Sequence, residues 1–210
     1  MPYMAVSAKQ QNRNKPQCFA PYKNLRIIID CAEFQLERSS NLQQQSNTFS
    51  DYKHCNTGKV LIGISCYRGV SFVSSCFEGR ISDKEIVLKS GLMDILEKGD
   101  TVMADRGFRL EEEMKNIGVT LIKPPDKPRK SAHLTARQEI QTKSIASVRI
   151  YVEHVIGKIK DWLILAHRVE LMNNVYLEDF VLIAAFLYNF TRIYIGQEKD
   201  KKKEQSKKKD

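Results

Sequence analysis

One short segment limits the choice of fold more than any other part of the chain. Leu25–Asp30, with the sequence LRIIID, is a nearly continuous apolar run that is interrupted only by Arg26 and ends in a carboxylate. Such a run is typical of a strand that is buried on both faces of a sheet. Thr101–Ala104 is a second run of this kind, and it too is followed by an aspartate, Asp105. The two runs predict an α/β protein with a central sheet flanked by helices.

The segments between these runs indicate that the sheet is mixed. Lys59–Ser65 and Val70–Cys76 are rich in strand-forming residues and predict an antiparallel hairpin with Gly69 in the turn. Thr101–Ala104 is followed by a helical segment, Leu110–Asn116, and by another short strand, which is the order that produces parallel strands. We therefore expect antiparallel and parallel pairs in one sheet.

Other local patterns place helices and loops. Ser82 and Glu85 form a capping box, which begins a helix that ends near Gly91. Asn41–Asn47 is polar and rich in glutamine, and we expect a loop there. A long helix is predicted from Thr135 to about Leu165, because its apolar residues recur with helical spacing. These residues are Val148, Val152, Val155, Ile156, Ile159 and Leu163.

The same patterns divide the chain into three parts. Residues 1–23 are polar and predict a flexible N-terminal segment. Residues 24–196, which close with an apolar helix from Leu177 to Ile195, predict one folded domain. Residues 197–210 are rich in lysine and predict a disordered tail.

Composition narrows the classes of function. The 210 residues carry a formal net charge of +9, which is compatible with a polyanionic partner. The best apolar run, Phe180–Tyr188, is too short to span a membrane, and Met1–Gln17 lacks the apolar core of a secretion signal. The five cysteines include no CxxC pair, which indicates reduced thiols in a nuclear or cytosolic protein and argues against a structural zinc site.

Three carboxylates are notable on chemical grounds. Asp30 and Asp105 follow buried strands, and open α/β sheets place ligand sites at the carboxyl ends of strands. Glu153 lies on a polar stripe of the long helix, near Gly157, which costs about 1 kcal/mol relative to alanine within a helix but permits close approach of a backbone or ligand. If these carboxylates converge, their oxygens suit Mg²⁺ or Mn²⁺, and two such ions can promote phosphodiester cleavage.

Several ordered motifs connect these residues to a known family. They are IIIDCAEFQLERSSN around Asp30, TFSDYKHCNTGKVLIGIS, FEGRISDKEI, GDTVMADRGF around Asp105, and SVRIYVEHVIGKIKDWLIL around Glu153. Together they resemble the DDE superfamily endonuclease domain of PIF/Harbinger-type transposases, from about Leu25 to Phe190. One departure is Ala32, where relatives commonly have threonine.

The resemblance implies a fold, a site and a cofactor. The fold would be RNase H-like, with the first aspartate on the first strand, the second after the fourth strand and the glutamate on a later helix. It implies that Asp30, Asp105 and Glu153 are catalytic and hold divalent metal, Mg²⁺ or Mn²⁺, as two ions. Asp83, in RISDKEI, matches another recurring position of the family and is a candidate further ligand.

Each of these residues also has an ordinary structural explanation. The two strand aspartates could simply close their strands, and Glu153 could be a solvated helix residue paired with Arg149 or Lys160. Asp83 could be stabilised only by the dipole at the start of its helix. The sequence alone leaves these alternatives open.

Basic residues near the carboxylates are the candidates for DNA contacts. Those on the proline loop 126–130 are expected to bind backbone phosphates, and two others border the carboxylates. The set comprises Lys127, Arg129, Lys130, Arg106 and Lys160.

The function expected from the resemblance is metal-dependent DNA endonuclease or strand-transfer activity in the nucleus. The alternatives are a domesticated, non-cleaving domain that binds DNA or protein, and an RNA-directed nuclease of the same fold. Met1–Lys23 is too short for a helix-turn-helix, so a separate DNA-binding protein is an expected partner, and a homo-oligomer is compatible with the sequence.

Overall fold

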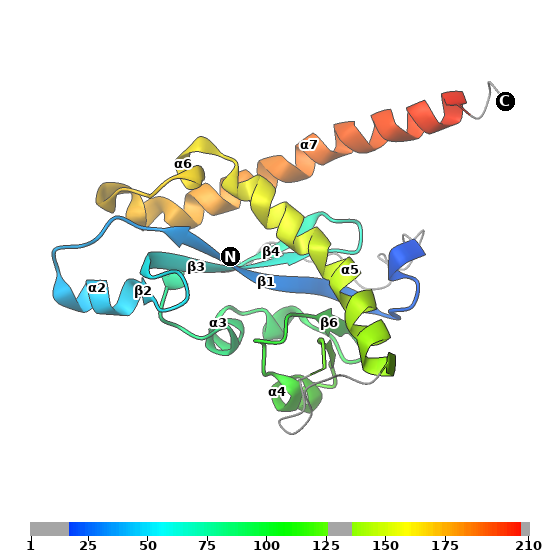
Figure 1. Ribbon diagram of the computed structural model, residues 1–210, viewed down its shortest axis with the longest axis horizontal. Coiled ribbons are helices and arrows are strands. Elements are labelled where there is room, and N and C mark those ends of the chain that lie inside the picture. The colour runs from blue at the N-terminus through cyan, green and yellow to red at the C-terminus, as the bar shows by residue number, and fades with distance from the viewer. Residues whose placement is uncertain (1–16, 126–135, 207–210) are drawn as a thin grey trace.

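The computed structural model of the protein describes residues 17–125 and 136–206 (Figure 1). The strands within these ranges are β1 (Leu25–Gln35), β2 (Phe49–Ser50), β3 (Cys55–Ile64), β4 (Val70–Val73), β5 (Phe77–Glu78), β6 (Thr101–Met103) and β7 (Thr120–Ile122). The α-helices are α2 (Leu42–Thr48), α3 (Asp83–Lys89), α4 (Glu111–Asn116), α5 (Ala136–Lys160), α6 (Leu163–Ala166) and α7 (Leu177–Ser206). The 3₁₀ turns are η1 (Gln17–Phe19), η2 (Met93–Ile95) and η3 (Leu171–Tyr176).

The strands form one mixed sheet in the order β2-β3-β1-β6-β7, and β4 and β5 also pair with β3. β1 is antiparallel to β3 and parallel to β6, and β6 is parallel to β7. The α/β fold predicted from the sequence, an RNase H-like mixed sheet flanked by helices, is confirmed.

Helices cover both faces of the sheet, and the central strand supplies side chains to both. α5 and α7 lie over one face, and α3 and α4 lie over the other (Figure 1). Side chains alternate along β1, as the geometry of a strand requires. Ile28 and Phe34 pack in the core beneath α5 and α7, whereas Ile27 and Ile29 pack in the core beneath α3 and α4. This burial explains why the run is apolar at successive positions.

Several local predictions are confirmed. The Oγ of Ser82 accepts a hydrogen bond of 3.2 Å from the backbone N–H of Glu85, and α3 begins at the next residue after this cap. β3 and β4 form the predicted antiparallel hairpin. The left-handed residue of its turn is Arg68, with φ +65°, and its guanidinium stacks 3.7 Å from the centroid of the Tyr151 ring.

Two predictions in the first third of the chain were wrong. β1 does not end at Asp30 but continues to Gln35, because β3 pairs with it over this whole length. The segment Asn41–Asn47, predicted as a loop, mostly belongs to α2. The Oδ1 of Asn41 accepts hydrogen bonds from the backbone N–H groups of Gln43 and Gln44, which caps this short helix.

The C-terminal helices also differ from the prediction. α5 ends at Lys160, because Trp162 is extended with φ −66° and ψ 129°. Leu163 therefore belongs to α6 and is 79% exposed, although it was expected on the buried face. α7 continues to Ser206, beyond Ile195, where the last helix was predicted to end.

Some predictions fall on residues outside the described ranges. These residues include the N-terminal segment up to residue 16 and the proline loop with Lys127, Arg129 and Lys130. The roles given to them stay predictions. Within the described ranges, no helix combines the length and apolar character needed to cross a membrane.

Candidate active site

Asp30 and Asp105 reach the same level of the sheet because β1 and β6 are parallel. Ile28 of β1 pairs with Met103 of β6, and each aspartate lies two residues after its member of that pair. β6 ends at Met103, whereas β1 continues beside β3 with Asp30 opposite Ile62. Both carboxylates line one cavity of about 550 Å³, which we call the carboxylate cavity.

Glu153 reaches the same cavity from α5. Its neighbour Val152 is fully buried against the sheet, and Ile156, one turn later, is nearly so. Asp83, at the start of α3, lines the cavity from the opposite side of the sheet. The structure therefore brings together all four carboxylates that the sequence selected. The other lining residues are Cys31, Glu33, Tyr52, Lys53, Lys59, Arg149, Ile156 and Lys160.

The guanidinium of Arg149 bridges two of these carboxylates. Its Nη1 lies 2.9 Å from Oδ1 of Asp105, and its Nη2 lies 3.3 Å from Oε1 of Glu153. The Arg149 side chain is only 12% exposed, so its charge acts in a partly desolvated environment. Asp105 Oδ1 also accepts a hydrogen bond of 2.6 Å from the backbone N–H of Arg106. Glu153 therefore forms the helix pair that was the ordinary explanation for it, and it still faces the cavity.

The environment of Asp30 disfavours the charged form of its carboxylate. Burial raises its pKa to about 6, against a usual value of 3.8. Arg149 and the backbone N–H of Cys31, which donates to Asp30 Oδ1 at 2.9 Å, lower the pKa, whereas the charges of Asp105 and Glu153 raise it further. A buried carboxylate beside other carboxylates is a group that a bound cation would stabilise in its charged form.

A lysine holds the second pair of acids in the cavity. Lys59 Nζ lies 3.4 Å from Oε1 of Glu33 and 3.5 Å from Oδ1 of Asp83, and it donates to the carbonyl of Ile81 at 3.1 Å. Burial, followed by the charge of Asp83, raises the pKa of the Cys31 thiol well above its usual value. Asp83 is thus compensated by Lys59 in addition to its place at a helix start.

The basic residues predicted beside the carboxylates separate into two kinds. Lys160 lines the cavity, and burial is the main cause that lowers its pKa. Its Nζ lies 5.4 Å from the centroid of the Phe34 ring. Arg106 is not among the lining residues, and its contact with the site is the backbone N–H that it donates to Asp105. The close approach of another backbone at Gly157 is absent, because no described atom outside the neighbouring helix backbone lies within 4 Å of the place its Cβ would take, and the approach of a ligand stays a prediction.

Sequence reasoning did not identify the roles of Arg149 and Lys59. Arg149 was visible as the residue four before Glu153, but only the tertiary structure shows that it also contacts Asp105. Lys59 stands opposite Glu33 because of the antiparallel register of β1 and β3. No local pattern in the sequence specifies that register.

The carboxylate oxygens that line the cavity are of the right chemical type to bind a divalent cation. Carboxylate oxygens are the ligands that Mg²⁺ and Mn²⁺ prefer. Within the described ranges, however, no three or more acidic, histidine or cysteine side chains are grouped so that they could hold a metal ion as they stand. The contacts of Arg149 with Asp105 and Glu153 would have to be exchanged when a cation binds.

Comparison with protein-family models gives a match to the model described as DDE superfamily endonuclease, over residues 29–189. The matched range includes Asp30, Asp83, Asp105 and Glu153. Neither the comparison with curated proteins nor that with solved structures found a match.

Proposed function

Because the chain belongs to the DDE superfamily endonuclease family, we propose that it cleaves DNA phosphodiester bonds with divalent cations held by Asp30, Asp105 and Glu153. One observation carries this proposal. The parallel register of β1 and β6, together with the position of α5, directs these three carboxylates into one cavity. Asp83 is the candidate for a further ligand from the same cavity.

The reaction is an in-line displacement at phosphorus. The oxygen of water, or of a DNA 3′-hydroxyl, forms a bond to phosphorus, and the bond to the leaving sugar oxygen breaks. Two Mg²⁺ or Mn²⁺ ions, when bound, favour deprotonation of the nucleophile and offset charge on the leaving oxygen. The protein contributes the carboxylates, and the proton that metal-free Asp30 holds below about pH 6 leaves it when a cation binds.

Cationic side chains of the cavity would bind the phosphate groups of the substrate. Lys53 and Lys160 both line it, and neither forms an ion pair with a described residue. Arg149 would be free to pair with a phosphate oxygen once a cation has replaced it at the carboxylates. Arginine and lysine contacts of this kind position the DNA backbone and carry no sequence information.

We assign the chain to the PIF/Harbinger-type branch of the family, on the ordered motifs around Asp30, Asp105 and Glu153. For such a protein the substrate would be chromosomal DNA, and we place its action in the nucleus for that reason. Target selection would come from a separate DNA-binding protein.

The second candidate function is DNA or protein binding without cleavage. It is favoured by Arg149, because a guanidinium that satisfies Asp105 and Glu153 can also stabilise a site that never binds metal. In that case the carboxylates would have a structural role.

Cleavage of a supercoiled plasmid and of a labelled duplex distinguishes the two functions. We expect nicking with Mg²⁺ or Mn²⁺, none with EDTA, and a loss of at least about a hundredfold in Asp30→Ala, Asp105→Ala and Glu153→Ala. Glu112→Ala, which removes an exposed acid from α4, is the matched control and should keep full activity. Nicking that survives in Asp105→Ala would refute the site. Salt-sensitive DNA binding by the wild type without nicking would establish the non-cleaving function, and a preference for labelled RNA would identify the RNA-directed alternative.

A further inference from the structure

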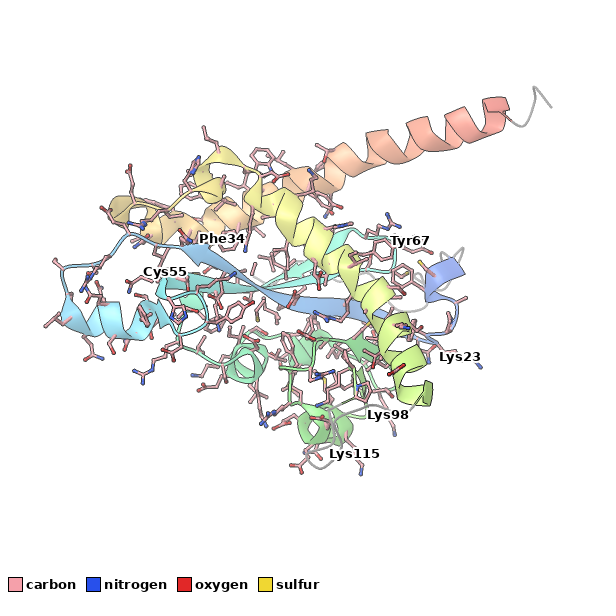
Figure 2. The ribbon with its side chains drawn as sticks, viewed as in Figure 1. Lys23, Phe34, Cys55, Tyr67, Lys98 and Lys115 are labelled. Carbon is pink, nitrogen blue, oxygen red and sulfur yellow. The ribbon has the colours of Figure 1, made fainter. Side chains whose placement is uncertain are left out.

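A second and larger cavity lies at the C-terminal end of β1, beyond Asp30 in the middle of the strand. Its volume is about 650 Å³, and three arginines from distant segments line it. Arg38 follows β1, Arg80 follows β5 and Arg168 follows α6. Figure 2 labels Cys55, another lining residue, beside α2 and β2. We call this hollow the arginine cavity.

The arginine cavity carries an excess of positive charge. Asp51 is the acid among its described lining residues, against three arginines. None of these arginines forms an ion pair with a described residue. Arg38 instead donates a hydrogen bond of 3.0 Å to Gln45, and Arg80 one of 3.5 Å to Ser46, both neutral side chains of α2. The guanidiniums are therefore available to an anionic ligand.

Helix α2, which accepts the hydrogen bonds of Arg38 and Arg80, is itself held in place by a buried residue. Asn56 of β3, which is 8% exposed, donates hydrogen bonds of 2.8 Å to the carbonyl of Gln45 and 2.7 Å to Oγ1 of Thr48. These bonds attach α2 to β3. The α2 side of the arginine cavity is consequently fixed in position, because buried hydrogen bonds hold this helix on the sheet.

One tight turn separates the arginine cavity from the carboxylate cavity. In the turn between β2 and β3, Asp51 and His54 line the arginine cavity, whereas Tyr52 and Lys53 line the carboxylate cavity. His54 has a left-handed backbone with φ +54°, and its N–H donates to the carbonyl of Ser50 at 2.8 Å. The turn thus presents side chains to both cavities: its two inner residues face the carboxylate cavity and its two outer residues face the arginine cavity.

The distance from Asp30 to the arginine cavity suits a nucleic acid backbone. Asp30 lines the first cavity and Leu36 the second, and β1 connects them. Six residues of a strand extend over about 20 Å at 3.3 Å per residue. B-DNA rises 3.4 Å per base pair, so this length corresponds to about six base pairs.

We propose that Arg38, Arg80 and Arg168 bind backbone phosphates of the DNA whose scissile bond lies in the carboxylate cavity, about six base pairs away. This inference takes the identity of the ligand from the proposed function. Guanidinium groups suit it because they pair with phosphate oxygens in a two-bonded arrangement. The contacts would raise affinity for all sequences alike.

The test is the salt dependence of DNA binding by the full chain in EDTA, where metal-dependent cleavage does not occur. Fluorescence anisotropy with duplexes of increasing length compares the wild type with the variant Arg38→Ala/Arg80→Ala/Arg168→Ala. The matched control, Lys89→Ala/Lys98→Ala/Lys115→Ala, removes the same charge from exposed positions. Figure 2 shows Lys98 and Lys115 far from Cys55, which lines the arginine cavity.

We expect the arginine variant to reduce the slope of log K against log salt by about 2 to 3, since each phosphate contact contributes about 0.9. Its affinity at 0.1 M salt should fall by about tenfold or more, and the gain in affinity with duplex length should disappear. The lysine control should change the slope by less than about 1. If the alanine variant does not fold, judged by circular dichroism, the triple Arg→Lys variant tests the same point: it should keep the slope and lose affinity, because lysine cannot form the two-bonded contact.

Equal slopes for the arginine and lysine variants would overturn the inference. It would also be overturned if an acidic peptide bound to the arginine cavity and DNA did not displace it. An assay of plasmid nicking distinguishes a failure of this inference from a failure of the proposed function. Nicking by the wild type with an unchanged slope in the arginine variant would refute only DNA binding at the arginine cavity. A reduced slope in a protein that never nicks would support the cavity and refute cleavage.

Discussion

Nη1 of Arg149, on α5, lies 2.9 Å from Oδ1 of Asp105, the carboxylate that follows β6. The same guanidinium contacts Glu153 one helical turn away at 3.3 Å. The protein therefore places its own cation among the carboxylates proposed to hold metal. A guanidinium and a divalent ion would compete for the same oxygens, and this competition can be measured.

The variant Arg149→Ala tests that competition through stability. Without metal it leaves Asp105 and Glu153 uncompensated, and we expect unfolding free energy to fall by about 1 to 2 kcal/mol, between the values for exposed and buried pairs. Mn²⁺ should then raise the melting temperature of the variant more than that of the wild type, because no guanidinium has to be displaced. Thermal unfolding of both proteins in EDTA and in Mn²⁺ measures the loss of stability and the shift in melting temperature.

Lys158→Ala is the control on the same helix, since it removes an exposed pair with Asp161. Its melting temperature should stay close to that of the wild type in both conditions. An equal response of Arg149→Ala and the wild type to Mn²⁺ would show that Arg149 does not compete with metal.

The raised pKa of Asp30 predicts how the stability of the metal-free protein depends on pH. Its pKa is about 6 in the fold and 3.8 ordinarily, so between these values the folded state binds more protons than the unfolded state. The contribution of Asp30 therefore destabilises the protein as pH rises from about 4 to above 6, by up to about 3 kcal/mol at 1.36 kcal/mol per unit. Asp30→Asn should remove this contribution.

Urea unfolding in EDTA at pH 4.5 and pH 7.5 provides the comparison. The advantage of Asp30→Asn over the wild type should be small at the lower pH and large at the higher one, because only the charged carboxylate is disfavoured. The difference between the two proteins cancels the titration of all other groups. A difference that is the same at both pH values would contradict the raised pKa.

Lys59 is expected to matter more for stability than lysines on the surface. Its side chain is 13% exposed, and its removal leaves the acids Glu33 and Asp83 near the cavity without their cation. We expect Lys59→Met to lose about 2 to 3 kcal/mol in urea unfolding. Lys89→Met is the matched control: it breaks an exposed helix pair with Glu85 and should lose less than about 0.5 kcal/mol.

A double variant tests the cause of the expected loss. Lys59→Met combined with Glu33→Gln should recover part of the stability, since one uncompensated charge is then removed as well. No recovery would indicate that Lys59 acts through Asp83 and the carbonyl of Ile81 and not through Glu33.

Two glycines should respond in opposite directions to alanine. At Gly157, in α5, a Cβ would meet no described atom within 4 Å, so Gly157→Ala should stabilise the helix by about 0.5 to 1 kcal/mol. At Gly63, in β3, a Cβ would lie 2.8 Å from Ile27 Cγ1 and 3.1 Å from Phe72 Cβ, so Gly63→Ala should cost about 1 to 3 kcal/mol. Melting temperatures check both. A Gly157→Ala protein that is more stable but binds DNA more weakly would show that the substrate approaches this helix face.

The sequence by itself determined the elements whose signals are local. The apolar runs at Leu25–Asp30 and Thr101–Ala104 specified buried strands, and the Ser82 cap specified the start of α3. Burial and capping act within a few residues, so they leave a local pattern. The motifs also selected Asp30, Asp105 and Glu153, which the structure brings to one cavity.

Only the tertiary structure decided the length of β1, the bridge formed by Arg149 and the arginine cavity. β1 extends to Gln35 because β3 pairs with it, and Arg38, Arg80 and Arg168 meet although they lie in three distant segments. Strand register and contacts between distant side chains depend on how whole layers pack together. No short stretch of sequence carries that information, and for this reason the chemistry of the site was predictable while its electrostatic arrangement was not.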